Sequence, residues 1–102
     1  MVILYLPLKA QWYNMIECGI KKDEYRDMTN YWIRRICGKD GVRYNTDGTV
    51  KTDITHVCFS YGYTKRRMLW RIKDIIVNVG KAEWGAPEHK LFNIRLLKRE
   101  PL

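Results

Sequence analysis

Hydrophobic and polar positions alternate along the chain with two different periods. Residues 2–6 form an aliphatic run bounded by Pro7, which predicts a buried first strand. Over residues 8–16 the apolar positions fall at helical spacing, and Gly19 ends this run as a helix-terminating glycine does. The pattern therefore predicts a strand followed by a helix.

The next segment is polar before helical spacing returns. Residues 21–27 carry one aromatic side chain among charged ones, which predicts a short strand or an extended segment. Apolar residues then recur at helical spacing over residues 28–37. Thr29 or Asn30 can cap this second helix, and Gly38 closes it.

The middle of the chain is rich in turn signals. Residues 38–53 contain three glycines and two Asp-Gly pairs, which predict a long loop or a hairpin excursion. Residues 55–61 then alternate as a strand does, and residues 62–67 follow as a cationic turn.

The last part of the chain predicts further strands. Residues 68–72 place their apolar side chains on one face, and residues 75–79 do so in the opposite phase. This change of phase falls at residues 73–74, where we expect a β-bulge or sharp bend. Residues 81–90 are irregular, and residues 92–96 alternate as the last strand. This order, β-α-β-α and then strands, predicts an α+β domain with a curved or barrel-like sheet and helices packed on it.

Composition narrows the class of protein. The 102 residues suit one domain, and 46% hydrophobic with 29% charged residues is a globular profile. The net charge of +8, together with four tryptophans and seven tyrosines, points to a polyanionic partner, with nucleic acid first among the candidates.

Several classes of site and location are not expected. No run of about 18 apolar residues is present, so no membrane span is predicted. Cys18, Cys37 and Cys58 are odd in number and have no CxxC spacing, so we expect reduced, mostly buried thiols in a cytoplasmic protein. His56 and His89 lack zinc-binding spacing, and the glycine-rich phosphate and dinucleotide motifs are absent. No metal and no cofactor is predicted, and His56 is interpreted as a strand residue with a satisfied hydrogen bond.

The densest polar cluster spans residues 19–26. In an extended segment alternate residues share a face, which places Lys22, Glu24 and Arg26 on one side and Lys21, Asp23 and Tyr25 on the other. Cations on both sides of Glu24 favour its ionised form. The segment is either a functional site or a solvated edge strand whose charges discourage aggregation.

Two other clusters carry aromatic side chains beside charges. In the turn at residues 61–67, tyrosines precede cations, which suits either base stacking with phosphate contacts or a hairpin with a charged tip. In the Gly/Pro loop at residues 83–87, Trp84 either plugs the end of a barrel or lines a pocket. Lys9, Trp12 and Tyr13 are interpreted as the start of the first helix and as core packing, and facing a cleft is the alternative for Lys9.

Gly19, Lys21, Glu24 and Arg26 form the pattern GxKxxExR at the end of the first predicted helix. This pattern resembles the signature of the ASCH domain family, whose fold is PUA-like. The likeness covers nearly the whole chain except residues 38–53. Within the family, the chain is similar to the short ASCH proteins of phages and gut bacteria. The segments that carry it are residues 9–16, 25–32, 59–63, 83–86 and 92–96.

The resemblance implies a small β-barrel with two flanking helices and a cleft beside the GxKxxExR segment. It also implies binding of RNA or of a modified nucleotide. Combined with the charge and aromatic patterns, it gives as expected binding residues Lys9, Lys21, Lys22, Glu24, Arg26, Tyr61, Tyr63, Lys65, Arg66, Arg67 and Trp84.

Other functions remain open at this point. Some ASCH proteins are amidohydrolases that deacetylate acetylated cytidine nucleosides, and others are ribonucleases. If this chain is an enzyme, the resemblance implies Lys21, Glu24 and Glu83 as catalytic residues. However, Lys22 and Glu24 stand where that amidohydrolase motif has threonines, which shifts weight toward binding. A phage or mobile-element accessory role, with the basic surface meeting an acidic protein, is a third interpretation.

Overall fold

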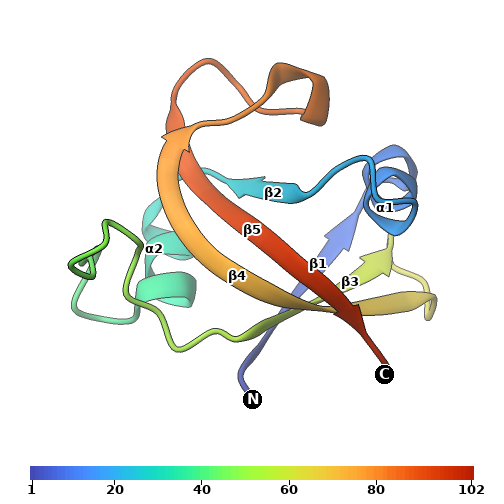
Figure 1. The fold of residues 1–102 in the computed structure, drawn as a ribbon, viewed down its shortest axis with the longest axis horizontal. Helices are drawn as coiled ribbons and strands as arrows, with labels where there is room; N and C mark the ends of the chain where they lie inside the picture. Colours follow the sequence, from blue (N-terminus) through green and yellow to red (C-terminus); the bar gives the residue numbers. More distant parts are fainter.

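A five-stranded sheet curls into a half-barrel and carries a helix near each end (Figure 1). The computed structural model describes all residues, 1–102. The strands are β1 (Ile3–Leu8), β2 (Asp23–Arg26), β3 (His56–Tyr61), β4 (Arg67–Val79) and β5 (Lys90–Glu100). The helices are α1 (Ala10–Glu17), α2 (Asn30–Cys37) and the short 3-10 turn η1 (Ala82–Trp84). The predicted α+β class with a curved, barrel-like sheet is confirmed.

The strand order across the sheet is β1-β3-β4-β5-β2. β1 runs parallel to β3, and the other neighbouring pairs are antiparallel. β4 is one long strand whose pairing with β5 shifts between Arg71 and Ile72 and again between Ile72 and Asp74. The predicted bulge at residues 73–74 is therefore confirmed, and it lies where β4 sweeps around the half-barrel in Figure 1.

The first strand is longer than predicted. β1 continues through Pro7 to Leu8, which is buried, so the expected strand end at Pro7 and helical role for Leu8 are wrong. Because β1 is an edge strand, a proline without an N–H group is tolerated in it. α1 begins at Ala10 instead.

Both helices end at glycines, as predicted. After α1, Gly19 has φ +85°, and the N–H of Ile20 donates to the carbonyl of Met15 at 3.0 Å. At the start of α2 the hydroxyl of Thr29 accepts a hydrogen bond from the N–H of Trp32 at 3.3 Å. Neither helix has the length and apolar character that crossing a membrane requires.

The core lies inside the curl of the sheet. Its apolar cluster joins Phe59 and Phe92 of the strands to Ile16 of α1 and Ile36 of α2. Tyr13 of α1 meets Tyr61 of β3 edge to face, with ring centroids 5.3 Å apart. These contacts pack α1 and α2 against the sheet.

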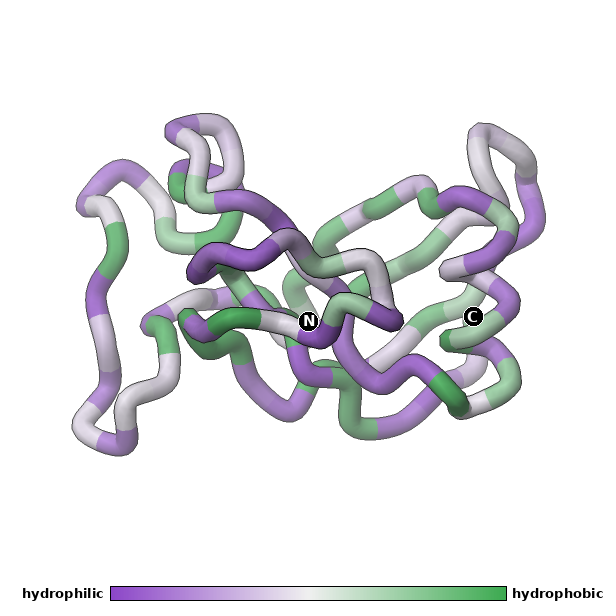
Figure 2. The backbone as a smooth tube through the Cα atoms, turned by 90° about the horizontal axis from the view of Figure 1, so that it is seen from above, coloured by the Kyte–Doolittle hydropathy of each residue, from purple (hydrophilic) through white to green (hydrophobic).

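Residues 38–53 form a loop that returns to the core. Its only ladder contact within itself is a single bridge between Tyr44 and Val50. Val50 is buried and its N–H donates to the carbonyl of Ile75 at 2.8 Å. Figure 2 shows that the projecting part of this loop is largely hydrophilic. The loop thus combines a polar excursion with an apolar anchor, which the turn signals alone do not reveal.

The structure also tests the expectations of a hydrogen-bonded His56 and of mostly buried cysteines. His56 is buried, with Nδ1 2.7 Å from the hydroxyl of Thr55 and Nε2 2.5 Å from Oε1 of Glu100, as expected for a satisfied strand histidine. The hydrogen bond to His56 lowers the pKa of the Glu100 carboxyl. Cys58 is buried, Cys37 is half-buried and Cys18 is exposed, so the expectation of mostly buried thiols is wrong.

Candidate functional site

A buried ion pair stands at the centre of the GxKxxExR segment. The ammonium of Lys21 donates to Oε1 of Glu24 at 2.5 Å and to the carbonyl of Asp23 at 2.6 Å. The residues are only 1% and 5% exposed. An isolated charge at such depth is costly, so each of the two depends on the other.

The backbone turn after α1 brings this pair together. Lys21 precedes β2, and its N–H donates to the carbonyl of Met15 at 3.0 Å. Strand alternation therefore does not apply to Lys21, and the expectation that it faces away from Glu24 is wrong. Arg26 does share the face of Glu24, with 3.3 Å between Nη1 and Oε2.

Two features of the surroundings shift the pKa of Lys21 in opposite directions. Burial lowers the pKa of Lys21, and the neighbouring carboxylate of Glu24 opposes that shift. The ammonium also lies 5.7 Å from the ring centroid of Trp12 and 5.2 Å from that of Tyr25. Oε1 of Glu24 accepts a second hydrogen bond from the N–H of Tyr25 at 3.1 Å. The pair is thus held by several partners and is preorganised.

A hollow of about 240 Å³, called here the cleft, opens beside this pair. Four residues expected from the sequence line it together, and they come from three separate parts of the chain. Its lining consists of Pro7, Leu8, Lys9, Trp12, Glu24, Tyr25, Arg26, Trp84 and Gly85. The cleft therefore combines two cations, one carboxylate and two indole rings.

The loop after β4 forms one wall of the cleft. Gly85 has φ +90°, and a Cβ placed on it would lie 2.8 Å from Cζ2 of Trp12. Trp84 is half-buried and packs against a small apolar cluster that includes Tyr25 and Leu91. Trp84 thus packs against this cluster and lines the cleft, which agrees with the pocket-lining interpretation made from the sequence.

Other expected residues lie outside the cleft lining. Lys22 and Glu83 are exposed and do not line the cleft. Tyr63 is 96% exposed in the turn after β3, and Lys65 of this turn and Arg67 at the start of β4 are also exposed. The structure therefore separates this turn from the cleft lining.

Arg66 of that turn and Tyr61 at the end of β3 have structural partners within the fold. The guanidinium of Arg66 donates to Oε1 of Glu17 at 2.7 Å and lies 5.0 Å from the ring centroid of Tyr61. It lies 5.2 Å from the ring centroid of Tyr13 as well. This cluster joins the turn to α1, which explains a tyrosine beside cations without any ligand.

The sequence assigns Trp12 to the core and Tyr25 to no role, yet both contact Lys21 and line the cleft. For Trp12, the signal that could have shown this is its place one helical turn after Lys9. No group of three or more His, Cys, Asp or Glu side chains lies close enough together to hold a metal ion.

Comparison of the chain with protein-family models, curated proteins and solved structures finds no match. The geometry of the site is therefore the basis for any functional assignment.

Proposed function

We propose that the protein is a cytoplasmic RNA- or nucleotide-binding domain of the ASCH family, with a PUA-like barrel whose cleft takes one base. The observation that carries this proposal is the composition of the cleft. Indole rings of Trp12 and Trp84 line a hollow whose charged groups are Lys9, Glu24 and Arg26.

Each part of the cleft suits one part of a nucleotide. An indole offers a stacking face for a base, worth about 1–3 kcal/mol per base. The cations Lys9 and Arg26 suit a phosphate. The carboxylate of Glu24 suits an exocyclic amino group of a base. Together these groups match a base with its phosphate better than a purely apolar ligand.

The size of the cleft favours a small ligand. Sites for drug-sized ligands usually occupy about 300–1,000 Å³. The cleft encloses about 240 Å³, which suits a single base with part of its sugar rather than a folded segment of RNA. Unpaired nucleotides are the usual targets of such stacking sites.

The ion pair gives less support to the amidohydrolase interpretation. Two cations hold the carboxylate of Glu24, Lys21 at Oε1 and Arg26 at Oε2, so it can accept a further hydrogen bond from a base but is poorly suited to take a proton from water. Glu83, the other expected carboxylate, does not line the cleft. Binding is therefore the function that the arrangement of these groups supports best.

Titration with cytidine monophosphate, followed through the indole N–H resonances, tests the proposal. We expect the resonances of Trp12 and Trp84 to shift in a saturable manner, because both rings line the cleft. Trp70, whose indole nitrogen is buried away from the cleft, serves as an internal control and should not move. Shifts confined to other residues, or no shift at all, would contradict a base site in the cleft.

A further inference from the structure

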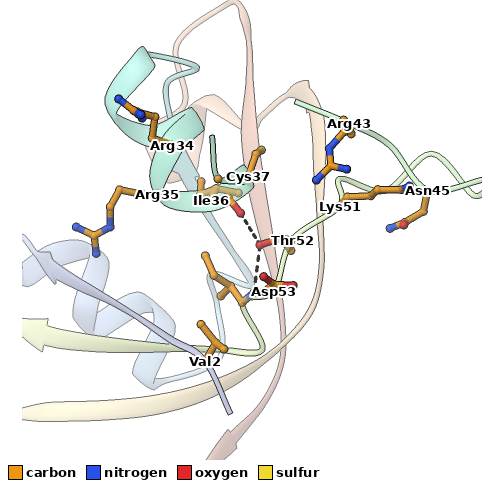
Figure 3. Close-up of a pocket in the computed structure, with 12 residues that line it drawn as sticks. Val2, Arg34, Arg35, Ile36, Cys37, Arg43, Asn45, Lys51, Thr52 and Asp53 are labelled. Carbon is orange, nitrogen blue, oxygen red and sulfur yellow. Dashed lines mark hydrogen bonds between the residues drawn. The ribbon is translucent and has the colours of Figure 1, made fainter. Parts of the chain in front are cut away.

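The largest hollow of the protein lies away from the cleft, between the end of α2 and the segment after it (Figure 3). It encloses about 500 Å³ and is called here the basic pocket. Its charged lining consists of Arg34, Arg35, Arg43 and Lys51, with Asp53 as the one carboxylate. The pocket therefore holds a clear excess of positive charge.

The cations are largely free to meet a ligand. Arg34 and Lys51 form no side-chain hydrogen bond or ion pair, and Arg43 has only a loose exposed contact with Asp40 at 3.8 Å. Arg34 and Arg35 also suit the negative end of the α2 dipole. That explanation does not cover Arg43 and Lys51, which come from the loop.

The frame of the pocket is fixed although its cations are exposed. The hydroxyl of Thr52 donates to the carbonyl of Ile36 at 2.7 Å and accepts from the N–H of Ile54 at 3.2 Å (Figure 3). These bonds tie the loop to the end of α2. In Figure 3 the arginines of α2 extend on one side and Arg43 and Lys51 lie on the other. The charges thus surround the hollow rather than converge on one point.

A row of cations and aromatic rings joins the basic pocket to the cleft. Arg26, which lines the cleft, lies 5.3 Å from the ring centroid of Trp32. That ring meets Tyr31 edge to face, with centroids 4.9 Å apart. Tyr31 in turn receives a hydrogen bond at 2.8 Å from Arg35, which lines the basic pocket. The row follows α2, whose eight residues span about 12 Å.

We propose that the basic pocket binds the phosphodiester backbone of a single nucleic-acid strand that continues along α2 from the base held in the cleft. This proposal rests on the proposed function and extends it from one nucleotide to a strand. Separated cations suit charges repeated along a polymer better than one small anion. The exposed ring of Tyr31, on the path between the two hollows, offers a face for an unpaired base.

The test compares charge-removing variants in binding an unstructured oligocytidylate of about 15 nucleotides, whose bases carry the exocyclic amino group that Glu24 suits. The pocket variant carries Arg34→Gln and Lys51→Gln, which remove two cations that have no partner in the fold. The control carries Lys90→Gln and Lys98→Gln, which remove two exposed cations of β5 that line neither hollow. An unchanged Tm of each variant establishes that it folds.

The counterion rule for single strands sets the expected size of the effect. Losing two phosphate contacts should weaken binding roughly 25-fold at about 0.1 M salt and reduce the slope of log K against log salt by about 1.4. The control should bind nearly as the parent protein does. Cytidine monophosphate, which occupies only the cleft, should bind the pocket variant and the parent protein equally.

Three results would overturn the proposal. If the pocket variant binds the oligonucleotide like the control, the basic pocket does not hold the strand, while a base site in the cleft stands. If cytidine monophosphate binds but the oligonucleotide binds no better, the same conclusion follows. If an oligoglutamate peptide binds the pocket and the oligonucleotide does not, the partner is an acidic protein segment instead.

Discussion

Replacing Glu24 with leucine is expected to lower the free energy of unfolding by about 3–5 kcal/mol, because it leaves the buried ammonium of Lys21 without a carboxylate partner. Lys21 is only 1% exposed, and its ammonium has Oε1 of Glu24 as its only side-chain acceptor. The carbonyl of Asp23 would remain, but it cannot neutralise the charge. Urea denaturation of the variant and the parent protein measures the difference.

The double variant Lys21→Met with Glu24→Leu is the matched control. Replacing both partners of a buried ion pair with apolar side chains is often neutral or stabilising, so most of the lost stability should return. A single Glu24→Leu variant as stable as the parent protein would contradict the account of the pair. So would a double variant that is no more stable than the single one.

Truncating Trp84 to alanine is expected to weaken binding of single-stranded RNA by roughly 5- to 150-fold, the equivalent of about 1–3 kcal/mol for one stacked base. Trp84 lines the cleft and is half-buried, so its ring is held in place before a ligand arrives. Fluorescence anisotropy with a labelled oligocytidylate measures the affinity of the variant and the parent protein.

Tyr63→Ala is the control for aromatic truncation in general. Tyr63 is 96% exposed, and its ring lies outside the cleft. Its removal should leave RNA affinity nearly unchanged. If Tyr63→Ala weakens binding while Trp84→Ala does not, the turn after β3 is the binding surface and the cleft is not.

Much of the fold follows from local patterns in the sequence. The glycines that end α1 and α2, the cap at Thr29 and the bulge in β4 each depend on residues close in sequence, which is why spacing predicts them. The extent of β1 depends instead on its place at the edge of the sheet. That position tolerates Pro7, and it is a property of the whole topology.

The candidate site could be predicted only in part, for a similar reason. Residue spacing brings out Glu24 and Arg26, which share one face of a strand. The contact of Lys21 with Glu24 depends on the turn after α1, and the meeting of Trp12 with Gly85 depends on packing between distant segments. The basic pocket could not be predicted from the sequence, because the turn signals of residues 38–53 indicate only a loop. The hydrogen bond from Thr52 that holds this loop against α2 joins residues far apart in the sequence.

The salt dependence of RNA binding tests the central claim most directly. Titrating the parent protein and an Arg26→Ala variant with the same oligocytidylate at salt concentrations from about 0.05 to 0.2 M gives log K against log salt, with a slope of about −0.7 for each phosphate neutralised. The account predicts a steep fall for the parent protein and a weaker affinity for the variant, because Arg26 lines the cleft. Absent binding, or binding that does not change with salt and is unaffected by Arg26→Ala, would contradict it.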